Sequence, residues 1–273
     1  MNNIKKLNLN KTKEFAKNIR INTLNMITSS KSSHIGSCFS IADVLSVLFV
    51  DVMKYNNKLF NEKTRDRLIF SKGHASAIYY SALAEAGFFS KKKLKLFCED
   101  GSDLFGHVTR NRIPGVEVSS GSLGHGLSIA AGMAISMKKD KINNRIFCII
   151  SDGECNEGST WEAALFAGHH KLNNITLIID YNKIQSFGRI SEVLNLNSLE
   201  KKWQSFNWSV KKVDGHSLSQ LSKILKSKKS IKPQLIIANT VKGKGVSFME
   251  NQLKWHYKSP NNKEYLLALD QLK

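Results

Sequence analysis

The sequence predicts an α/β domain built on a doubly wound, mainly parallel sheet with helices on both faces. The clearest sign is residues 145–151, RIFCIIS, a continuous apolar run that is typical of a parallel strand covered on both faces. Similar short apolar runs alternate along the chain with longer stretches of helical periodicity. A length of 273 residues, 41% of them hydrophobic, suits one large domain with a sizeable core.

Local composition predicts the elements in chain order. Residues 1–12 are expected to form a polar, Lys- and Asn-rich arm, and residues 13–273 a single domain. The expected helices are 13–28, 40–53, 75–86, a small-residue helix with Leu127, Ala131 and Ala134 at helical spacing, and 160–171. The expected strands are 67–70, 145–151, 176–180 and 234–239. Two segments rich in Ser or Gly, 29–37 and 98–126, are expected to be irregular.

The bulk composition argues against several classes of protein. No stretch of about 18 uninterrupted apolar residues occurs, so we expect no membrane span. The N-terminal residues lack the apolar core of a signal peptide, so we do not expect export. The four cysteines match no zinc-binding pattern, and we expect them to be reduced thiols in a cytoplasmic protein.

The formal net charge of +19 raises the question of a nucleic-acid-binding role. The lysines are spread along the whole chain in short clusters and are accompanied by many Asn and Ile residues, which favours a bias in coding over a binding surface. We therefore expect no specific nucleic acid partner. The charge should still attract anions, sugar phosphates among them.

Polar residues follow two strands that are expected to be neighbours. Asp152-Gly153 comes directly after the strand 145–151, and Asn182 follows the strand 176–180. Carboxylate, amide and carbonyl oxygens are hard ligands that suit Mg²⁺ or Ca²⁺, with diphosphate oxygens completing the coordination. Gly153 lets the backbone approach a phosphate closely. An Asp-Gly step alone is more often a plain turn with the Asp as a helix cap, but the pairing with Asn182 favours a metal site.

Four of the eight histidines lie in loops or beside glycines, far apart in the sequence: His34, His74, His107 and His256. A single histidine is more often structural than catalytic. Several that follow strands in loops favour a functional role, because loops on a rigid scaffold carry function. Imidazole can transfer protons and bind hydroxyl groups near pH 7. The other four, His125, His169, His170 and His216, are expected to be structural.

The stretch from Asp152 to Gly188 resembles the thiamine diphosphate motif, which opens with Gly-Asp-Gly and closes near an Asn. Glu157-Gly158, Trp161-Glu162-Ala163 and Ala167 resemble the transketolase family, above all the enzymes that are split into two chains. The resemblance extends from about Ala16 to His256 and beyond. It covers the diphosphate-binding domain of the family, with the thiamine diphosphate-binding fold, and none of the pyrimidine-binding domain.

The resemblance implies a role for individual residues. The metal, Mg²⁺ with Ca²⁺ or Mn²⁺ as substitutes, would be held by Asp152, Asn182 and the backbone carbonyl of Ile184. Thiamine diphosphate would contact His74, Gly121, Ser122, Leu123, Gly153, Glu157, Asn182 and His256. The catalytic set would be His34, His107 and His256. The chain departs from the family at Ser33, Ile35, Ser122 and Ser151, where the family has Gly, Pro, often Pro, and Gly.

The implied activity is the transfer of a two-carbon ketol unit from a ketose phosphate to an aldose phosphate, as in the pentose phosphate pathway. A separate C-terminal polypeptide would supply the pyrimidine-binding domain, its glutamate and the arginines of the sugar phosphate site, in a two-fold hetero-oligomer. Two alternatives stay open at this point. The chain could be the α-type subunit of another thiamine diphosphate enzyme, a 2-oxoacid dehydrogenase or deoxyxylulose-phosphate synthase. It could also be a basic scaffold or nucleic-acid-binding protein without catalysis.

Overall fold

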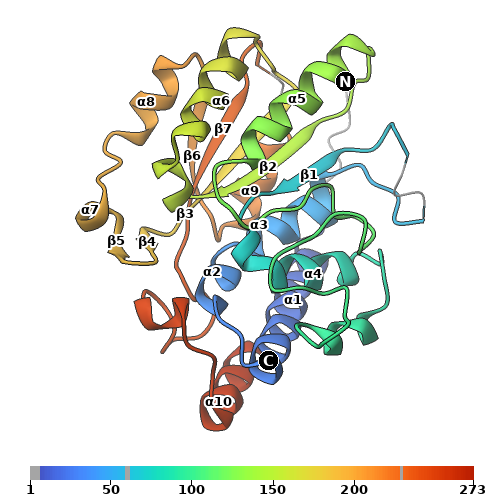
Figure 1. Cartoon of the computed structure of the whole chain (residues 1–273), viewed down its shortest axis with the longest axis vertical. Coiled ribbons are helices and arrows are strands. Elements are labelled where there is room, and N and C mark those ends of the chain that lie inside the picture. The colour runs from blue at the N-terminus through green and yellow to red at the C-terminus, as the bar shows by residue number, and fades with distance from the viewer. Residues whose placement is uncertain (1–6, 59–61, 228–229) are drawn as a thin grey trace.

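A five-stranded, fully parallel sheet forms the centre of the molecule (Figure 1). This computed structural model describes residues 7–58, 62–227 and 230–273. The strand order is β1-β2-β3-β7-β6, with bounds β1 Arg67–Phe70, β2 Ile146–Ser151, β3 Ile175–Tyr181, β6 Ser209–Asp214 and β7 Gln234–Asn239. The predicted α/β fold with a parallel sheet is confirmed, and so are the four predicted strands, each to within one residue at either end.

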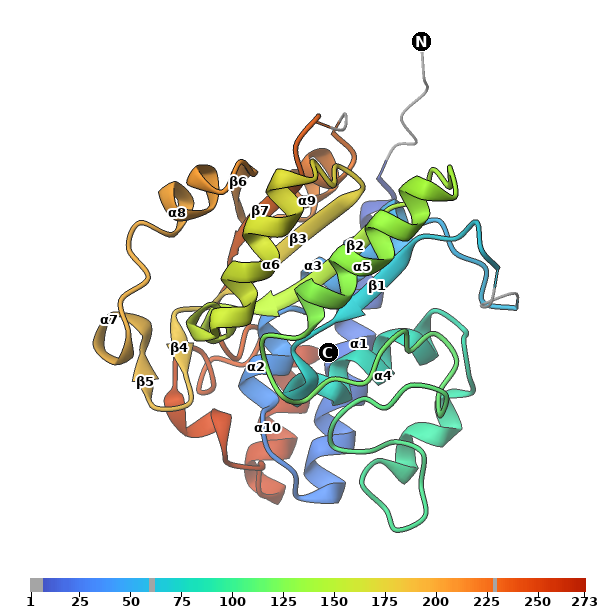
Figure 2. The same ribbon diagram turned by 45° about the horizontal axis from the view of Figure 1, so that its top comes forward.

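Alternating residues of the strands point to two separate cores. Phe147 and Ile149 of β2 face one layer of helices, α1 (Leu9–Ser30), α3 (Ala42–Val47), α4 (Ser76–Glu85) and α9 (Leu218–Leu225). Cys148 and Ile150 face the other layer, α5 (Gly126–Lys139), α6 (Gly158–His169) and α8 (Leu199–Ser205). Figure 2 shows α5 and α6 side by side over one face of the sheet. Because both faces are covered, β2 is buried along its whole length.

The N-terminal helices differ from the predicted bounds. Helix α1 begins at Leu9, four residues before the expected start, because Asn8 caps it by accepting a hydrogen bond from the amide of Lys11 at 3.1 Å. The irregular segment expected over 29–37 is confirmed only for 31–34, because α1 continues to Ser30 and helix α2 (Ile35–Ser40) begins at Ile35 and is buried at every residue. The helix expected over 40–53 is divided between α3 and a π-helical turn η1 (Leu48–Val52). The proposed separation of an arm, 1–12, from a domain, 13–273, stays a prediction, and its first six residues lie outside the described part of the chain.

Several elements of the C-terminal half were not predicted. Strand β6 reads SVKKVD and lies at the edge of the sheet, so it lacks the continuous apolar run that marks the inner strands. The short hairpin β4–β5 (Ile184–Gln185, Gly188–Arg189), helix α7 (Ile190–Val193) and helix α10 (Asn262–Leu272) follow from turns and caps that the periodicity did not reveal. The described residues also form the 3-10 turns η2 (Gly73–Ala75), η3 (Lys91–Leu96), η4 (Gly153–Asn156) and η5 (Leu253–His256).

Within the described residues, none of the helices combines the length and the apolar character that crossing a membrane requires.

The end of α6 packs directly on the backbone that follows α8. A Cβ placed on Gly168 would lie 1.8 Å from the carbonyl oxygen of Phe206, which is far inside van der Waals contact. A Cβ on Gly132, in the middle of α5, would meet no atom of the described residues within 4 Å. These two helical glycines therefore form a matched pair: close packing requires glycine at 168, whereas a larger side chain fits at 132.

Gly168→Ala should lower the free energy of unfolding by about 2–3 kcal/mol, because the backbone of α6 must move away from Phe206. Gly132→Ala should raise it by about 0.4–1 kcal/mol, since alanine restricts the unfolded chain and favours the helix. Urea denaturation of the two variants beside the parent chain measures both effects. Equal stability of Gly168→Ala and the parent chain would contradict the packing described for α6.

Candidate active site

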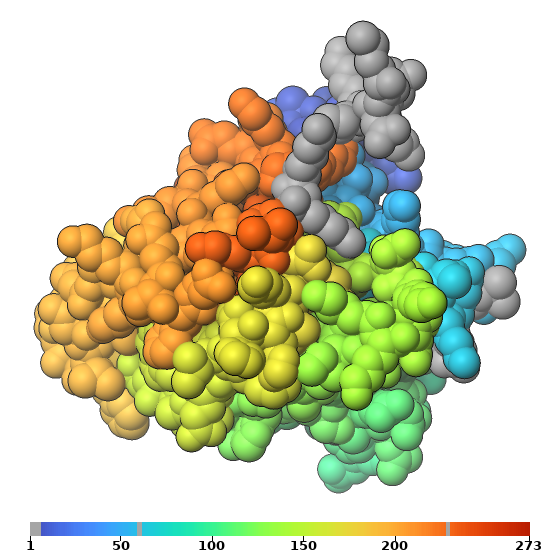
Figure 3. Space-filling view, turned by 90° about the horizontal axis from the view of Figure 1, so that it is seen from above, coloured from blue at the N-terminus to red at the C-terminus, as the bar shows by residue number. Residues whose placement is uncertain are grey.

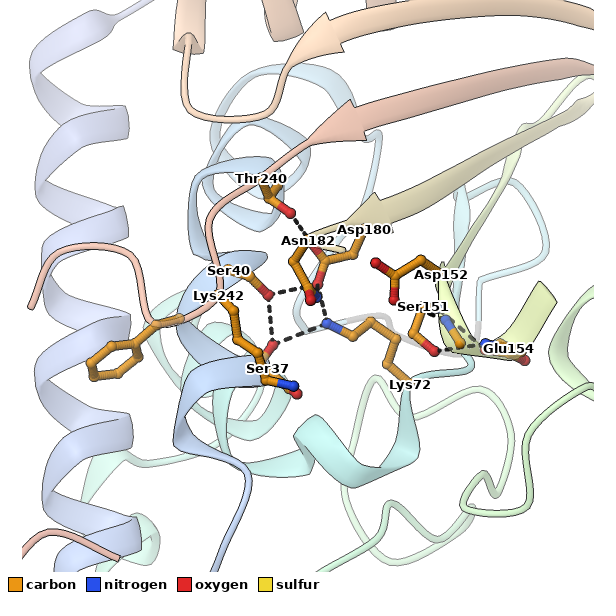
Figure 4. A network of polar contacts seen from close by, with 12 residues as sticks. Ser37, Ser40, Lys72, Ser151, Asp152, Glu154, Asp180, Asn182, Thr240 and Lys242 are labelled. Atoms are coloured by element: carbon orange, nitrogen blue, oxygen red, sulfur yellow. Dashed lines mark hydrogen bonds and ion pairs between the residues drawn. The ribbon is translucent and has the colours of Figure 1, made fainter. Parts of the chain in front are cut away.

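The carboxyl ends of four neighbouring strands meet at one edge of the sheet and carry polar side chains (Figure 4). Asp152 follows β2 and Asp180 lies near the end of β3, and these two strands are neighbours, as the sequence predicted. Lys72 follows β1 and Thr240 follows β7. This edge is where ligands bind in open α/β sheets, so it is the candidate site.

A buried ion pair lies at the centre of this edge. The Lys72 ammonium contacts the Asp180 carboxylate, and neither side chain is exposed to solvent. Asp180 also accepts hydrogen bonds from the hydroxyls of Ser40, at 2.6 Å, and Thr240. Burial alone would raise the pKa of Asp180, but the Lys72 ammonium lowers it below its usual value. Asp180 is thus a carboxylate that ties together strands β1, β3 and β7 and helix α2.

The predicted metal ligands lie next to one another. The backbone amide of Lys183, between Asn182 and Ile184, donates to Asp152 Oδ2 at 2.6 Å, which brings the two strand ends into contact. Gly153 donates its amide to Asp152 Oδ1 at 2.8 Å. Asn182 Oδ1 accepts from the amide of Ile184 at 3.2 Å. Burial, and then the Asp180 carboxylate, raise the pKa of Asp152 to about 6.

These donors fit a hard divalent cation better than a soft one. A carboxylate, an amide oxygen and a backbone carbonyl are the oxygen ligands that Mg²⁺ takes, and burial and Asp180 raise the pKa of Asp152 more than the charge of Lys72 lowers it. The carbonyl oxygen of Ile184 at present accepts a hydrogen bond from Lys242 Nζ at 2.9 Å. A metal bound there would replace that hydrogen bond. The ammonium of Lys242 is itself buried, and burial lowers its pKa to about 8.

Three of the four predicted histidines come together beside this edge. The ring of His34 lies 5.3 Å from that of His74 and 4.8 Å from that of His256, measured between centroids. His34 has a left-handed backbone (φ 73°), and its amide donates to the carbonyl of His256 at 2.9 Å. His256 Nδ1 lies 2.8 Å from Lys242 Nζ.

All three rings are held neutral by their surroundings. Burial, followed by the positive charges of His107 and Lys242, lowers the pKa of His34 to about 4. Burial and then Lys242 lower the pKa of His256 to about 3, and burial and Lys72 bring the pKa of His74 well below its usual value. The buried Nδ1 of His34 has no partner within the described residues. The site therefore presents the Lys242 ammonium, which contacts a carbonyl and an imidazole but no carboxylate within the described residues, and the ring nitrogen of His34. These groups fit a diphosphate and a hydroxylated substrate.

The predicted loop 121–123 packs on the turn that carries His74. A Cβ on Gly73 would lie 2.5 Å from the backbone of Ser120, so only glycine lets the two segments approach this closely. A Cβ on Gly121 would lie 3.1 Å from the ring of His107, which places the fourth histidine at the same loop. Ser122 is exposed and Leu123 half-buried.

A buried carboxylate, Glu154, holds this loop in place. It accepts hydrogen bonds from the hydroxyl of Ser71 and from the amide of Gly124, the latter at 2.9 Å. Gly126, at the start of α5, donates its amide to the Ser71 hydroxyl at 3.1 Å. A Cβ on Gly124 would lie 2.8 Å from Cβ of Glu157, so the exposed Glu157 borders the same loop.

Most of the predicted site residues therefore lie around one edge of the sheet. His216, expected to be structural, follows β6 at the same edge, and both of its ring nitrogens are bonded within the chain. Its Nδ1 contacts Asp43 at 2.7 Å and its Nε2 accepts the amide of Val241 at 2.8 Å. The sequence did not reveal the polar residues that hold the site together: Lys72, Asp180, Lys242, Ser37 and Ser40. Lys72 could have been noticed because it precedes Gly73-His74 after a strand. Lys242 belongs to a chain rich in lysine, and only its burial distinguishes it.

The fold and the site define a domain that binds a phosphorylated cofactor at the carboxyl edge of a parallel sheet, and known proteins resemble it closely. Residues 11–267 match the model of the family described as transketolase, thiamine diphosphate binding domain. The chain is 39% identical over 246 residues to a subunit of apulose-4-phosphate transketolase from Actinobacillus succinogenes, covering 90% of this chain and 89% of that protein. It is 40% identical over 240 residues to a subunit of 6-deoxy-6-sulfo-D-fructose transketolase from Clostridium sp. strain MSTE9, covering 87% of each.

Complete transketolases share the same domain within a longer chain. The chain is 37% identical to human transketolase over 90% of its own length but only 39% of that protein. The crystal structure of transketolase from Campylobacter jejuni superimposes with a TM-score of 0.90 at 33% identity, over 97% of this chain and 43% of that one. The chain belongs to the transketolase family and corresponds to its N-terminal, thiamine diphosphate-binding domain.

Removing one member of the buried ion pair should destabilise the fold. Lys72→Met leaves the Asp180 carboxylate buried without its cation, and we expect it to lower the free energy of unfolding by about 3–5 kcal/mol. Lys242→Met is the matched control, because Lys242 is equally buried but contacts a carbonyl and an imidazole in place of a carboxylate. It should change stability by less than about 1 kcal/mol.

The double variant Lys72→Met/Asp180→Asn, which removes both charges, should regain at least about half of the loss. Urea denaturation of the four proteins measures these differences. A loss in the double variant as large as in Lys72→Met would show that packing, and not the unpaired charge, carries the effect.

Acidification should lower the free energy of unfolding of the free chain at pH values where these histidines are still neutral in the folded state. The pKa values of His34, His74 and His256 lie below the usual 6.5, so the unfolded chain binds more protons than the folded chain as pH falls from 7.5 to 6. The free energy of unfolding should then fall by on the order of 2 kcal/mol over this interval. Urea denaturation at the two pH values measures it, and the loss should be smaller in His34→Gln. A stability that rises toward pH 6 would contradict the neutral state of these rings.

Proposed function

We propose that this chain is the diphosphate-binding half of a two-chain transketolase, which transfers a two-carbon ketol unit from a ketose phosphate to an aldose phosphate. The observation that carries the proposal is the grouping of oxygen donors, buried lysines and neutral histidines at one edge of the sheet. The chain spans nine tenths of the Actinobacillus transketolase protein, which is itself named as a subunit, and this supports a two-chain enzyme.

The metal and the diphosphate would be held together at the strand ends. Asp152, Asn182 and the carbonyl of Ile184 are the proposed ligands of Mg²⁺, or of Ca²⁺ or Mn²⁺ in its place. His74, His256 and the backbone of Gly153 are the proposed contacts of the diphosphate, with the charges of Lys72 and Lys242 close by. Gly121, Ser122, Leu123 and Glu157 are the proposed contacts with the rest of the cofactor. When bound, thiamine diphosphate supplies the electron sink that ketol transfer requires.

Proton transfer to and from the sugar is the proposed work of the histidines. A ketose must lose the proton of its C3 hydroxyl before its C2–C3 bond breaks. His34, with its unpartnered Nδ1, is the proposed acceptor of that proton, because a neutral imidazole can act as a base at neutral pH. His107 and His256 are the proposed contacts of the neighbouring hydroxyls. The ring centroid of His256 lies 4.8 Å from that of His34, and the ring of His107 borders the loop at Gly121.

A second polypeptide is the proposed source of what this site lacks. The two bacterial relatives are themselves named as subunits, which implies a companion chain for each, and this chain covers 87–89% of their lengths. The companion would carry the pyrimidine-binding domain, the glutamate that contacts the pyrimidine ring and the arginines for the sugar phosphate, in a two-fold hetero-oligomer. We further propose that the pair works in the cytoplasm.

The choice of sugar is the finest part of the proposal. Sugar phosphates of the pentose phosphate pathway are the first candidates, and the names of two relatives add apulose 4-phosphate and 6-deoxy-6-sulfo-D-fructose. Membership of the transketolase family favours ketol transfer over the two alternative cofactor enzymes and over a scaffold role.

Ketol transfer should require both polypeptides. We expect activity when this chain is co-expressed with a pyrimidine-domain partner and supplied with thiamine diphosphate and Mg²⁺, and none from either chain alone. Asp152→Ala should lower kcat/KM by at least about 100-fold through loss of the metal. A coupled assay with xylulose 5-phosphate and ribose 5-phosphate, and then with the other two sugars as donors, measures the reaction.

Asp270→Ala, an exposed carboxylate on α10, is the matched control and should leave the activity unchanged. Full activity of this chain alone would overturn the need for a partner. A pair that binds thiamine diphosphate in calorimetry but transfers no ketol unit from any of the sugars would overturn the proposed reaction.

A further inference from the structure

A second concave surface lies at the other end of β1 from the candidate site. It is a groove of ≈ 1050 Å³ between the start of β1, the second half of α5 and the segment 110–117. Figure 2 shows α5 on one side of β1 and the segment that precedes α5, drawn in green, on the other. In Figure 3 the residues around 62–67, in cyan, meet those around 136–142, in green. The volume suits an organic ligand of intermediate size.

The inner wall of the groove holds two guanidinium groups that share one carboxylate. Arg65 contacts Glu117 directly, and Arg67 Nη1 lies 3.5 Å from the other oxygen of the same carboxylate. All three side chains are at most 16% exposed. The cluster therefore keeps one positive charge in excess where water screens it poorly. Burial lowers the pKa of Arg67. The carboxylate of Glu117 raises that pKa in part, and the positive charge of Arg65 lowers it further.

The mouth of the groove adds further positive charge. Lys63 and Arg110 are exposed, and Arg112 has a carboxylate, that of Asp103, 3.8 Å away. Counted over the whole lining, five cationic side chains face two carboxylates, those of Glu117 and Asp140. Five less two leaves a net charge of +3 on the lining of this one groove. A groove with an excess of one sign of charge attracts ions of the other.

Part of the lining is apolar. Met133 and Met137 of α5 and Ile142 after it line the groove, together with Ile113 and Val116. Met133, Met137 and Ile142 are half-buried, so they keep apolar area that a ligand can cover. Methionine side chains adapt their shape readily and make favourable contacts with aromatic rings. The groove thus pairs a site for negative charge with a surface for a flat apolar group.

We propose that this groove binds a nucleotide, with its phosphates at Arg67 and Arg110 and its base against Met133 and Met137. Within the described residues, Arg67 donates one N–H to Glu117 and one to the carbonyl of Glu62, which leaves three of its five N–H groups for phosphate oxygens. An anion there would neutralise the excess charge of the Arg65–Glu117–Arg67 cluster. The site is separate from the carboxyl edge, because Arg67 opens β1 and Lys72-Gly73-His74 follows its end. The proposal does not depend on ketol transfer.

Isothermal titration of the purified chain with ADP tests this. We expect ADP to bind at least about fivefold more tightly than pyrophosphate, because the base covers the apolar wall, and adenosine alone to bind more weakly than either. Arg67→Gln and, separately, Arg110→Gln should each weaken ADP binding by about tenfold or more. Arg110 is on an exposed loop, so its substitution leaves the fold intact even if Arg67→Gln does not. Lys201→Gln, an exposed cation on α8, is the charge-matched control and should bind like the parent chain.

ADP could also bind at the candidate site through its diphosphate, and the same titrations separate the two. Binding that survives excess thiamine diphosphate with Mg²⁺, and survives in Asp152→Asn, supports the groove. Binding that disappears in either of these, or that Arg67→Gln and Arg110→Gln leave unchanged, overturns it. Equal affinity for ADP and pyrophosphate would overturn the nucleotide as the ligand class, and an equal loss in Lys201→Gln would reduce the effect to the overall charge of the chain.

Discussion

The ion pair between Lys72 and Asp180 is the interaction on which the site depends. It lies entirely out of water, so each charge needs the other and every remaining donor or acceptor must be satisfied. The hydroxyls of Ser40 and Thr240 and the carbonyl of Ser37 provide those partners. Because they come from helix α2 and the end of β7, the pair holds together the loops that carry the histidines and the oxygen donors.

The electrostatics of the edge fit the proposed binding of a diphosphate together with a metal. Two buried ammonium groups and three neutral imidazoles surround the strand ends, while the carboxylate of Asp152 is kept from full ionisation by burial and by Asp180. A diphosphate would complement the ammonium of Lys242, which contacts a carbonyl and an imidazole, and a divalent cation would stabilise the charged form of Asp152. Each ligand therefore favours the other, which is a physical reason for the two to bind together.

Close approaches of backbone give the site its shape. Gly73 lets the segment 119–121 lie against the turn of His74, and the buried Glu154 ties the following residues to the end of β1. The same segment continues, on its N-terminal side, into residues 110–117 of the cationic groove. One irregular stretch thus borders both concave surfaces, the candidate site and the proposed nucleotide site. This stretch contains no helix or strand, so specific hydrogen bonds to its backbone set the path that it follows.

The sequence by itself determined the class of fold and the position of the polar residues that follow the inner strands. The inner strands are continuous apolar runs because both of their faces are covered, and the polar residues directly after them must then lie at one edge. The edge strand β6 carried no such run, and α2 was hidden in a segment rich in Ser and Gly. Only the tertiary structure decided which of 41 basic residues matter, because burial against Asp180, Ile184 or Glu117 distinguishes Lys72, Lys242 and Arg67 from the rest. Burial depends on contacts between segments far apart in the chain, and no local pattern records them.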